Sequence, residues 1–568
     1  MSDLLLPLLV VVPIVAATLP LALGLKYDDV GWSVAALTTV GLTAAATAVA
    51  AAVYTGGGFN HELGGFAPPV GIELVADELS AAVVLLVAVV SVLTLAFSRV
   101  AGPRGNAFYS GYLLLTGGLM GVVLTGDLFN MFVFLEIVGL TTYALIAADR
   151  SGASAYASVK YLVLGTVGAS LYLVGVGYVF LATGTLNMID LQSAIAAAGY
   201  TDPLIQAGYA FIVAGFALKI ALFPVHTWQP DAYQRAPDAV TAYVAALVST
   251  AAAYALIRVT YTAFTVDFLA ANEAITLGVL VVAGVSILTG SALAAMQSDL
   301  KRMFAYSSVA QFGMIAAAVA LANEWALLGG IVHLVGHGLL KFGLFLAVGL
   351  LALGYGARQV GDLASLARRA PYTAGSLAVL GLALVGIPPS IGFLGKWYIA
   401  YGAVQEGGAG GGVIGISIAA VIFISTLFTL AYVARLIEKL YFAGVGLPDH
   451  GHGESHDDHG HGGHGDHGDH GDHDVVAADG GHATDGGYAD DDGQAADGSH
   501  VDDVGHAAAG DEPVAPEPDA PTTTGVPDRV PTAAFVVLIA TTITAVGLGF
   551  AGMLFADLLD PFLTEVFA

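Results

Sequence analysis

Residues 216–228 read FALKIALFPVHTW and combine two features that membrane helices rarely tolerate. The segment is long and apolar, yet it carries a lysine, Lys219, and a proline, Pro224. A proline inside a helix removes a backbone hydrogen bond and kinks or breaks the helix. An ammonium group at the bilayer centre costs at least about 2.5–3.5 kcal/mol on insertion scales. The stretch therefore predicts an interrupted membrane helix with a functional lysine.

A second stretch repeats this combination. Residues 385–397 read VGIPPSIGFLGKW, with Pro388 and Pro389 before Lys396, and a third lysine, Lys341, lies in another apolar segment. Irregular backbone inside a membrane is tolerated only beside protein or a water-filled cavity. Interrupted segments at corresponding places in two halves of a chain indicate an inverted-repeat transporter. The three lysines favour proton or cation transport.

The composition is that of a polytopic, all-α membrane protein. Of the 568 residues, 57% are hydrophobic and 11% are charged, and no cysteine occurs, which excludes disulfides and thiolate metal sites. Apolar runs near the ~20 residues that cross a bilayer recur along the chain. We predict about fourteen spans: 4–25, 31–54, 74–98, 108–126, 128–147, 158–182, 205–228, 238–264, 272–296, 303–321, 325–354, 373–404, 412–442 and 531–556.

The two breaks, in spans seven and twelve, suggest a domain organisation with two inverted five-helix repeats. We predict helices one to three in residues 1–107, a first repeat of helices four to eight in 108–264, a second, inverted repeat of helices nine to thirteen in 265–447, an insert in 448–530 and a last transmembrane helix in 531–568.

The positive charges predict the orientation. Fourteen of the eighteen Lys and Arg residues fall in loops after odd-numbered spans, whereas only Arg258 follows an even-numbered span. Lysine and arginine are enriched in cytoplasmic loops. We therefore expect a multi-pass cell-membrane protein with both termini outside.

The insert differs from the rest of the chain. Residues 449–528 contain 21 acidic residues, twelve of the sixteen histidines and no lysine or arginine. Such a composition predicts a disordered cytoplasmic segment. Two interpretations remain open: a solvated linker, or loose metal binding or pH sensing by repeated histidines such as His450, His452, His456, His459 and His461.

Glu136 supplies a counter-charge within the predicted fifth span. It lies mid-helix with apolar neighbours, where an unpaired carboxylate is unfavourable. An ion pair with Lys219 is the simplest solution, since unit charges ~4 Å apart attract by about 4 kcal/mol at an effective dielectric near 20. Separating the pair would favour release of the lysine proton, so the pair can act as a switch.

His333, His337 and Lys341 follow one another at steps of four in the predicted eleventh span. This spacing puts them on one helical face, a candidate stripe for proton transfer. Two other interpretations of these residues remain. One is a structural role; the other, a metal site, is less favoured because Leu334 stands where zinc proteases need a glutamate.

Near the first break, His226 and Asp231 are candidates to cap the interrupted helix and orient it. Asp77 and Glu78 suggest a solvated helix N-terminus.

Several longer motifs carry a resemblance to a known family. They are KIALFPVHTWQPDA at 219–232, DLKRMFAYSS at 299–308, the His333–His337–Lys341 triplet and GIPPSIGFLGK at 386–396. These resemble the antiporter-like family of proton-conducting membrane subunits, which comprises the D subunit of Mrp-type multisubunit Na⁺/H⁺ antiporters and the related L, M and N subunits of complex I. The strings at 160–165 and 183–191 look most similar to the Mrp D subunit.

The resemblance implies fourteen spans, two inverted five-helix repeats and broken helices seven and twelve. It implies that Glu136 and Lys219 are the switch pair, Lys341 the second-repeat lysine and Lys396 the terminal lysine. One departure stands out: the family's mid-helix-eight lysine or histidine aligns with Thr250 here. A hydroxyl cannot hold a proton near neutrality. Thr250 and Tyr254 are then the candidates for bridging the halves, with water.

We expect a proton-translocating subunit of a multisubunit Na⁺/proton antiporter, not itself an enzyme. The alternative is a proton-pumping membrane subunit of a complex I-like NADH:quinone oxidoreductase or hydrogenase-like complex, and a third class is a scaffold or metal sensor built on the insert. No flavin, iron–sulfur or nucleotide motif occurs, so we expect no cofactor. Expected partners are other membrane subunits, protons, Na⁺ and lipid, and not nucleic acid.

Overall fold

A computed structural model describes residues 4–405, 412–443 and 532–568 of the chain. These residues belong to one of the two units into which the chain divides, formed by residues 1–445 and 526–568. The predicted insert at 448–530 lies outside the described residues, and so do its candidate metal ligands. The interpretations of this segment therefore stay predictions.

The N-terminal part holds four helices and a β-hairpin. They are α1 (Leu5–Ala16), α2 (Thr18–Gly24), α3 (Gly31–Gly56), β1 (Phe59–Glu62), η1 (Leu63–Gly65), β2 (Glu73–Ala76) and α4 (Glu78–Ala101). The strands are antiparallel, with Phe59 opposite Ala76. The predicted third span, 74–98, thus began too early. Helix α4 starts at Glu78 because the Asp77 carboxylate accepts a 2.8 Å hydrogen bond from the Ser80 amide, and the Ser80 hydroxyl accepts one from the Asp77 amide.

The predicted spans four to eight correspond to a group of helices with one clear interruption. The elements are α5 (Asn106–Leu124), α6 (Leu128–Ile146), η2 (Ala147–Asp149), α7 (Gly152–Thr183), α8 (Met188–Ala198), α9 (Pro203–Lys219), η3 (Val225–Thr227), α10 (Trp228–Arg235), α11 (Asp238–Arg258), η4 (Val259–Phe264) and α12 (Thr265–Ala271). The interruption lies between α9 and α10, at the predicted break.

The remaining elements hold the second interruption. They are α13 (Glu273–Ala295), α14 (Leu300–Leu321), α15 (Glu324–Tyr355), η5 (Val360–Leu363), α16 (Leu366–Arg369), α17 (Pro371–Val385), α18 (Ile391–Val404), α19 (Val413–Ile437), η6 (Glu438–Phe442), α20 (Thr532–Gly547), η7 (Leu548–Phe550) and α21 (Gly552–Phe567). Helix α17 ends before Pro388 and Pro389, and α18 begins after them.

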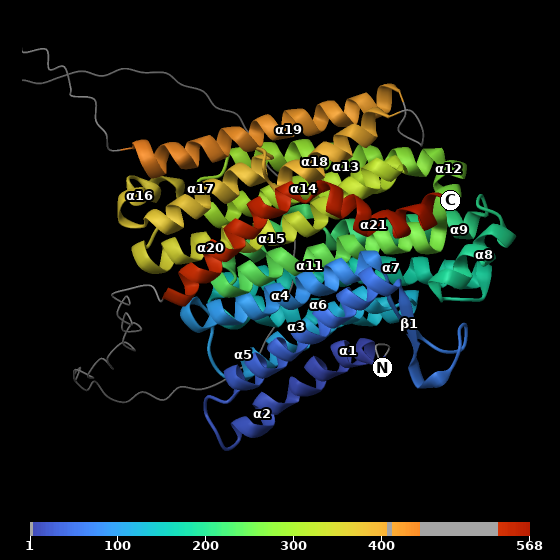
Figure 1. Cartoon of the computed structure of the whole chain (residues 1–568), viewed down its shortest axis with the longest axis horizontal. Helices are drawn as coiled ribbons and strands as arrows, with labels where there is room; N and C mark the ends of the chain where they lie inside the picture. Colours follow the sequence, from blue (N-terminus) through green and yellow to red (C-terminus); the bar gives the residue numbers. More distant parts are fainter. Residues whose placement is uncertain (1–3, 406–411, 444–531) are drawn as a thin grey trace, which may run out of the picture. The chain divides into compact units, whose positions relative to one another are not determined.

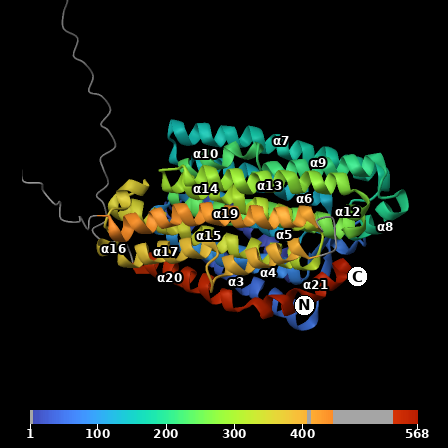
Figure 2. The same ribbon diagram turned by 90° about the horizontal axis from the view of Figure 1, so that it is seen from above.

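Twelve helices or joined helices of the described residues are long and apolar enough to cross a membrane. The other two predicted spans, seven and twelve, are the interrupted pairs α9–α10 and α17–α18, whose halves are each too short. In Figures 1 and 2 the long helices lie side by side with their axes roughly aligned. The chain is a polytopic helical membrane protein.

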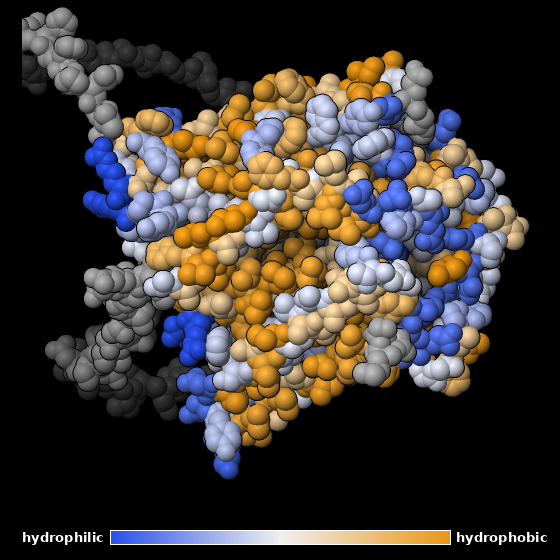
Figure 3. All heavy atoms as spheres, viewed as in Figure 1, coloured by the Kyte–Doolittle hydropathy of each residue, from blue (hydrophilic) through white to orange (hydrophobic). Residues whose placement is uncertain are grey.

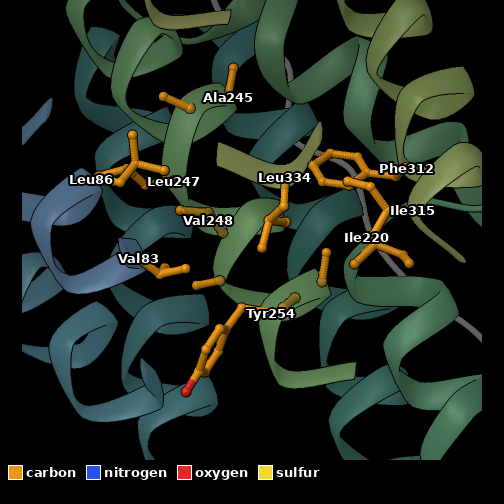
Figure 4. Close-up of a cluster of buried hydrophobic side chains, with 14 of the residues drawn as sticks. Val83, Leu86, Ile220, Ala245, Leu247, Val248, Tyr254, Phe312, Ile315 and Leu334 are labelled. Atoms are coloured by element: carbon orange, nitrogen blue, oxygen red, sulfur yellow. The ribbon is translucent and has the colours of Figure 1, made fainter. Parts of the chain in front are cut away.

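Three helices form the core. Every residue of α11 from Ala239 to Arg258 is buried, and nearly all of α14 and α15 is buried too. Figure 4 shows part of this core, where side chains of α4, α14 and α15 surround α11. The labelled ones include Val83, Leu86, Leu247, Val248, Phe312, Ile315 and Leu334. Any group on α11 is therefore shielded from lipid.

The outer helices expose apolar side chains. Val163 of α7, Val281 of α13 and Phe423 of α19 are all more than half exposed. On the face drawn in Figure 3, hydrophobic residues cover the middle of the helices, and hydrophilic residues gather at their two ends. Apolar surface of this kind suits contact with lipid or with other membrane subunits.

Each broken helix packs closely, through one of its halves, against an unbroken helix. Helix α7 packs against α9, and α15 packs against α18. Glycines permit both approaches: a Cβ at Gly175 would lie 2.6 Å from the Gly208 carbonyl oxygen, and one at Gly395 would lie 2.7 Å from the His333 Cα. The unbroken helix before each break is thereby held tightly against one half of the broken helix.

Candidate functional site

Glu136 and Lys219 form the ion pair that the sequence predicts. Lys219 ends α9, and its Nζ donates a 3.3 Å hydrogen bond to Oε1 of Glu136 on α6. The lysine side chain is 8% exposed and the glutamate side chain 26%. A void of about 10 Å³, lined by Lys219, Tyr161 and Val248 among others, lies beside the pair. That volume is about what one water molecule needs.

Side chains satisfy the carbonyls that the break in helix seven frees. The indole N–H of Trp228 donates to the Leu218 carbonyl at 2.9 Å, and the Ser249 hydroxyl donates to the Lys219 carbonyl at 3.3 Å. The amide of Phe223, just before Pro224, donates to the Ser286 hydroxyl at 3.1 Å. These bonds fix the end of α9, and with it the backbone that carries Lys219.

Asp231 does not cap the break as predicted; it forms ion pairs with two neighbouring helices instead. It lies in the first turn of α10 and forms no cap; its Oδ2 binds Nζ of Lys160 on α7 at 2.6 Å, and its Oδ1 binds Nη1 of Arg302 on α14 at 3.0 Å. It therefore connects the two predicted repeats. The buried His226 ring lies near Phe223 and Tyr306, and its Nδ1 has no hydrogen-bond partner among the described residues.

The predicted stripe on α15 faces α14. Nζ of the fully buried Lys341 donates to the Phe304 carbonyl at 2.7 Å and to the Ser307 hydroxyl, and no carboxylate of the described residues pairs with it. Nε2 of His333 lies 2.8 Å from Oε1 of Gln311. Sequence reasoning missed these partners on α14. A lone Gln311 in an otherwise apolar part of that helix was the available signal.

His337 has a different environment from His333. Both of its ring nitrogens are buried without a hydrogen-bond partner in the part of the chain that the structure describes, and its ring meets Phe312 edge-on at 4.5 Å. Within the same residues, no third His, Cys, Asp or Glu joins the two histidines in a metal-binding group.

Lys396 occupies the second break. Its Nζ donates to the carbonyls of Leu384 and Val385 at 2.7 and 3.0 Å. These are terminal carbonyls of α17, left without helical partners because Pro388 and Pro389 interrupt the chain. The ammonium thus joins α18 to the end of α17. A cation at a helix C-terminus also interacts favourably with the helix dipole.

Helix α11 separates the two lysine sites. It packs against α9 on one side and α15 on the other, and α15 in turn packs against α18. Thr250 near the middle of α11 is 1% exposed, and its hydroxyl has no partner among the described residues. One turn further, the Tyr254 hydroxyl donates to the Val123 carbonyl at 2.6 Å. The structure therefore sets a hydroxyl, not an ionisable group, between the halves.

Arg258 corrects two expectations. The charge pattern predicts it in a loop, but it ends α11 and is 5% exposed. Its Nη2 lies 2.6 Å from Oδ1 of Asp77, its Nη1 binds Oδ2, and its Nε donates to the Tyr254 hydroxyl at 3.0 Å. Asp77 is therefore one half of a bidentate ion pair, and not a solvated helix end. Sequence could not reveal a partner 181 residues away.

Two cavities lie at opposite ends of α11. One, of about 600 Å³, includes Asp77, Glu78, Tyr254 and Arg258 in its lining. The other, of about 570 Å³, is lined by Asp149, Arg235, Asp238, Asp299, Lys301 and Arg358 among others. In the second cavity, Nζ of Lys301 binds Oδ1 of Asp238 at 3.0 Å. Charged groups thus reach the buried helix from both ends.

Comparison with known proteins identifies the family. Residues 125–423 match a family described as NADH:quinone oxidoreductase/Mrp antiporter, transmembrane. The chain belongs to this family. The matched region includes Glu136, all three membrane lysines and both broken helices. The resemblance stated from the sequence motifs is confirmed.

Relatives within the NADH:quinone oxidoreductase/Mrp antiporter family come from both of its named branches. The N subunit of the NADH-quinone oxidoreductase of Desulforudis audaxviator is 38% identical over 452 residues, 78% of this chain and 87% of that protein. The D subunit of the Na⁺/H⁺ antiporter of Bacillus subtilis is 32% identical over 388 residues, 68% of this chain and 76% of that protein.

A solved structure extends the similarity to the whole length. The Mrp complex from Dietzia sp. DQ12-45-1b contains a chain that matches with a TM-score of 0.78 and 25% identity. The match covers 100% of this chain and 97% of that one. The fold is therefore that of a membrane subunit of the NADH:quinone oxidoreductase/Mrp antiporter family.

Proposed function

We propose that this protein is the proton-translocating subunit of a multisubunit antiporter that exchanges a monovalent cation, Na⁺, for protons. The observation that carries the proposal is the set of three buried lysines, of which Lys219 and Lys396 adjoin helix breaks. The relative from the Bacillus subtilis antiporter and the full-length match to the Mrp complex support the antiporter branch. By itself the chain is then a transporter subunit and not an enzyme.

In the proposed path, a proton enters from one membrane face and loads Lys219 or Lys341. It passes along His333 and His337 to Lys396 and leaves by the other face. The Glu136–Lys219 pair is the switch, and Pro224, His226, Asp231, Pro388 and Pro389 keep the broken helices in place. The membrane potential, worth about 2.3 kcal/mol per charge per 100 mV, drives the movement.

The orientation and the domain division form part of the proposal. The end of the helices at which Arg235, Lys301 and Arg358 line one cavity is taken as cytoplasmic, which puts both termini outside. The repeats are taken as residues 108–264 and 265–447, and the presence of one broken helix in each, α9–α10 and α17–α18, supports that division. The protein then works within the cell membrane beside other membrane subunits.

A second candidate is a proton-pumping subunit of a redox-driven complex. The 38% identity to a subunit of an NADH-quinone oxidoreductase favours it. The same buried row would then move protons in response to electron transfer on partner subunits.

Cation-induced proton flux in inverted vesicles that contain the whole assembly separates the two candidates. The wild type is compared with Glu136→Ala, Lys219→Ala and Lys396→Ala, and Na⁺ is added without an electron donor. Glu273→Gln serves as the control, because Glu273 is an exposed carboxylate at the start of α13. Flux that the three substitutions abolish and the control retains supports the antiporter. Flux that appears only with NADH or another donor supports the redox pump.

Thr250 provides a second test of the path. Its hydroxyl has no partner among the described residues, so Thr250→Val is expected to leave stability unchanged or raise it. If water at this hydroxyl carries protons between Lys219 and Lys341, the same substitution slows the flux, whereas Thr250→Ser preserves it. Equal flux in all three proteins would exclude this hydroxyl from the path.

A further inference from the structure

The cavity at the C-terminal end of α11 is built from distant parts of the chain. It lies between the β1–β2 hairpin, α8, η4 and α21, at the end of the helices where Figure 1 places β1 and the C-terminus. Its volume is about 600 Å³. Its charged lining residues are Asp77, Glu78, Arg258 and Glu565. The path proposed above uses none of these four residues.

The charges of the lining do not balance. The Arg258 guanidinium binds both carboxylate oxygens of Asp77 and donates to the Tyr254 hydroxyl. This single positive charge faces three carboxylates in the lining, so Glu78 and Glu565 leave the lining with a net negative charge. Glu565 is exposed at the rim, but Glu78 is only 9% exposed, and its carboxylate makes no ion pair or hydrogen bond with another of the described residues. A buried, unpaired carboxylate is costly unless a positive charge accompanies it.

Neutral oxygen atoms complete the set of donors. Gln192 and Thr262 line the same cavity and bring an amide and a hydroxyl group to it. Oxygen donors of this kind suit a hard cation. Since a water molecule occupies about 30 Å³ of liquid volume, the cavity also holds an ion with part of its hydration shell.

We propose that this cavity is a monovalent-cation site in which Glu78 and Glu565 are the charged ligands. The proposal rests on the proposed antiport function. It says where Na⁺ binds this subunit: at the end of the helices opposite the end that carries most of the lysines and arginines. The Asp77–Arg258 pair forms the inner wall. Figure 4 shows the Tyr254 hydroxyl pointing away from the apolar core side chains around it, and this tyrosine also lines the cavity.

The arrangement also predicts where the cation stops. Thr250 lies two helical turns from Arg258 along α11, with Tyr254 between them. Arg258 and Tyr254 both line the cavity where it meets α11, and the positive charge of the guanidinium opposes the passage of a cation toward the middle of the helix. Na⁺ is held at the helix end, while proton transfer runs through the lysine row.

Equilibrium binding of ²²Na⁺ to the purified, intact assembly tests the site directly. The proteins are the wild type, Glu78→Gln, Glu565→Gln, the double variant and the control Glu273→Gln. We expect the double variant to bind Na⁺ about tenfold more weakly, since it loses both uncompensated charges. The control should bind as the wild type does. Because Glu565 is exposed, its single variant reports on the site even if Glu78→Gln impairs folding.

Proton flux measured against Na⁺ concentration supplies the second readout. The double variant should need about ten times more Na⁺ for half-maximal flux, at an unchanged maximal rate. Unchanged Na⁺ affinity in the double variant, or tighter binding of Mg²⁺ than of Na⁺, would overturn the site. Na⁺ binding that depends on Glu78, without Na⁺-induced flux in the wild type, would instead leave the site standing and refute the antiport function.

Discussion

The Lys396 ammonium donates a 2.7 Å hydrogen bond to the Leu384 carbonyl, across the interruption between α17 and α18. A second bond, of 3.0 Å, goes to the Val385 carbonyl. One side chain therefore both carries a charge into the membrane and completes the end of a helix. Removing it should affect stability and transport together.

We expect Lys396→Met to abolish cation-induced proton flux and to lower stability by about 1–3 kcal/mol, because two buried carbonyls lose their donor. Thermal unfolding of the purified protein and vesicle flux measure the two effects. Lys439→Met is the control, since that lysine side chain is 39% exposed. Full flux in the Lys396 variant would contradict its place in the path.

Glu136→Gln leaves the Lys219 ammonium without its carboxylate. Breaking a fully buried ion pair costs about 3–5 kcal/mol. Because Glu136 is 26% exposed, we expect a smaller loss, of about 1–3 kcal/mol. The double variant Glu136→Gln/Lys219→Met should recover stability but not flux. A double-mutant cycle on the unfolding free energy measures the coupling, and additive single effects would show that the pair does not interact.

Gly395 sets the distance between α15 and α18. A Cβ at this position would lie 2.6 Å from the His333 Cβ and 2.9 Å from its backbone nitrogen, so Gly395→Ala should separate the helices and displace His333. We expect a loss of about 1–3 kcal/mol in stability, together with reduced flux. Gly278→Ala in α13, where nothing lies within 4 Å of the added Cβ, should be neutral or stabilising. Equal behaviour of the two variants would argue against tight packing at Gly395.

Asp362 gives a pH dependence outside the membrane. Its carboxylate accepts hydrogen bonds from the Gln359 and Arg358 amides at 2.8 and 3.0 Å, and these bonds lower its pKa. A lowered pKa in the folded state stabilises the loop at pH above the ordinary value of about 3.9 and loses this effect as pH falls through the folded value. Amide exchange at residues 358 and 359, corrected for intrinsic rates, should therefore accelerate in acid.

Asp362→Asn is the matched control for this loop. It lacks the titrating group, so its amide exchange should show no such acid-dependent step. The same step in both proteins would assign it to another group.

The sequence revealed the parts of the fold that single residue types dictate. Prolines at 224, 388 and 389 predicted both helix breaks, because proline cannot sustain the backbone hydrogen bond. Apolar length predicted the spans. The Glu136–Lys219 pair followed from the cost of burying either charge alone.

The parts that the sequence hid depend on contacts between distant segments. Asp77 and Arg258 are 181 residues apart; alone, Asp77 looked like a solvated charge at a helix start and Arg258 like a loop charge. The partners of Lys341 are a backbone carbonyl and a serine hydroxyl on α14, groups that occur throughout the chain. Only the packing of the helices shows which of these common groups lies within hydrogen-bond distance of a buried charge.

Within a few turns, helix α14 contacts three of the predicted functional residues: Asp231, Lys341 and His333. Arg302 binds Asp231, the Phe304 carbonyl and Ser307 bind Lys341, and Gln311 binds His333. From Arg302 to Gln311 the helix rises only about 13–14 Å. Side-chain hydrogen bonds keep donor–acceptor distances of about 2.7–3.2 Å, and a contact near 3.6 Å is no longer one. A slide of α14 by a single ångström would thus lengthen all three contacts at once, so this helix mechanically couples Asp231 in the first predicted repeat to Lys341 and His333 in the second.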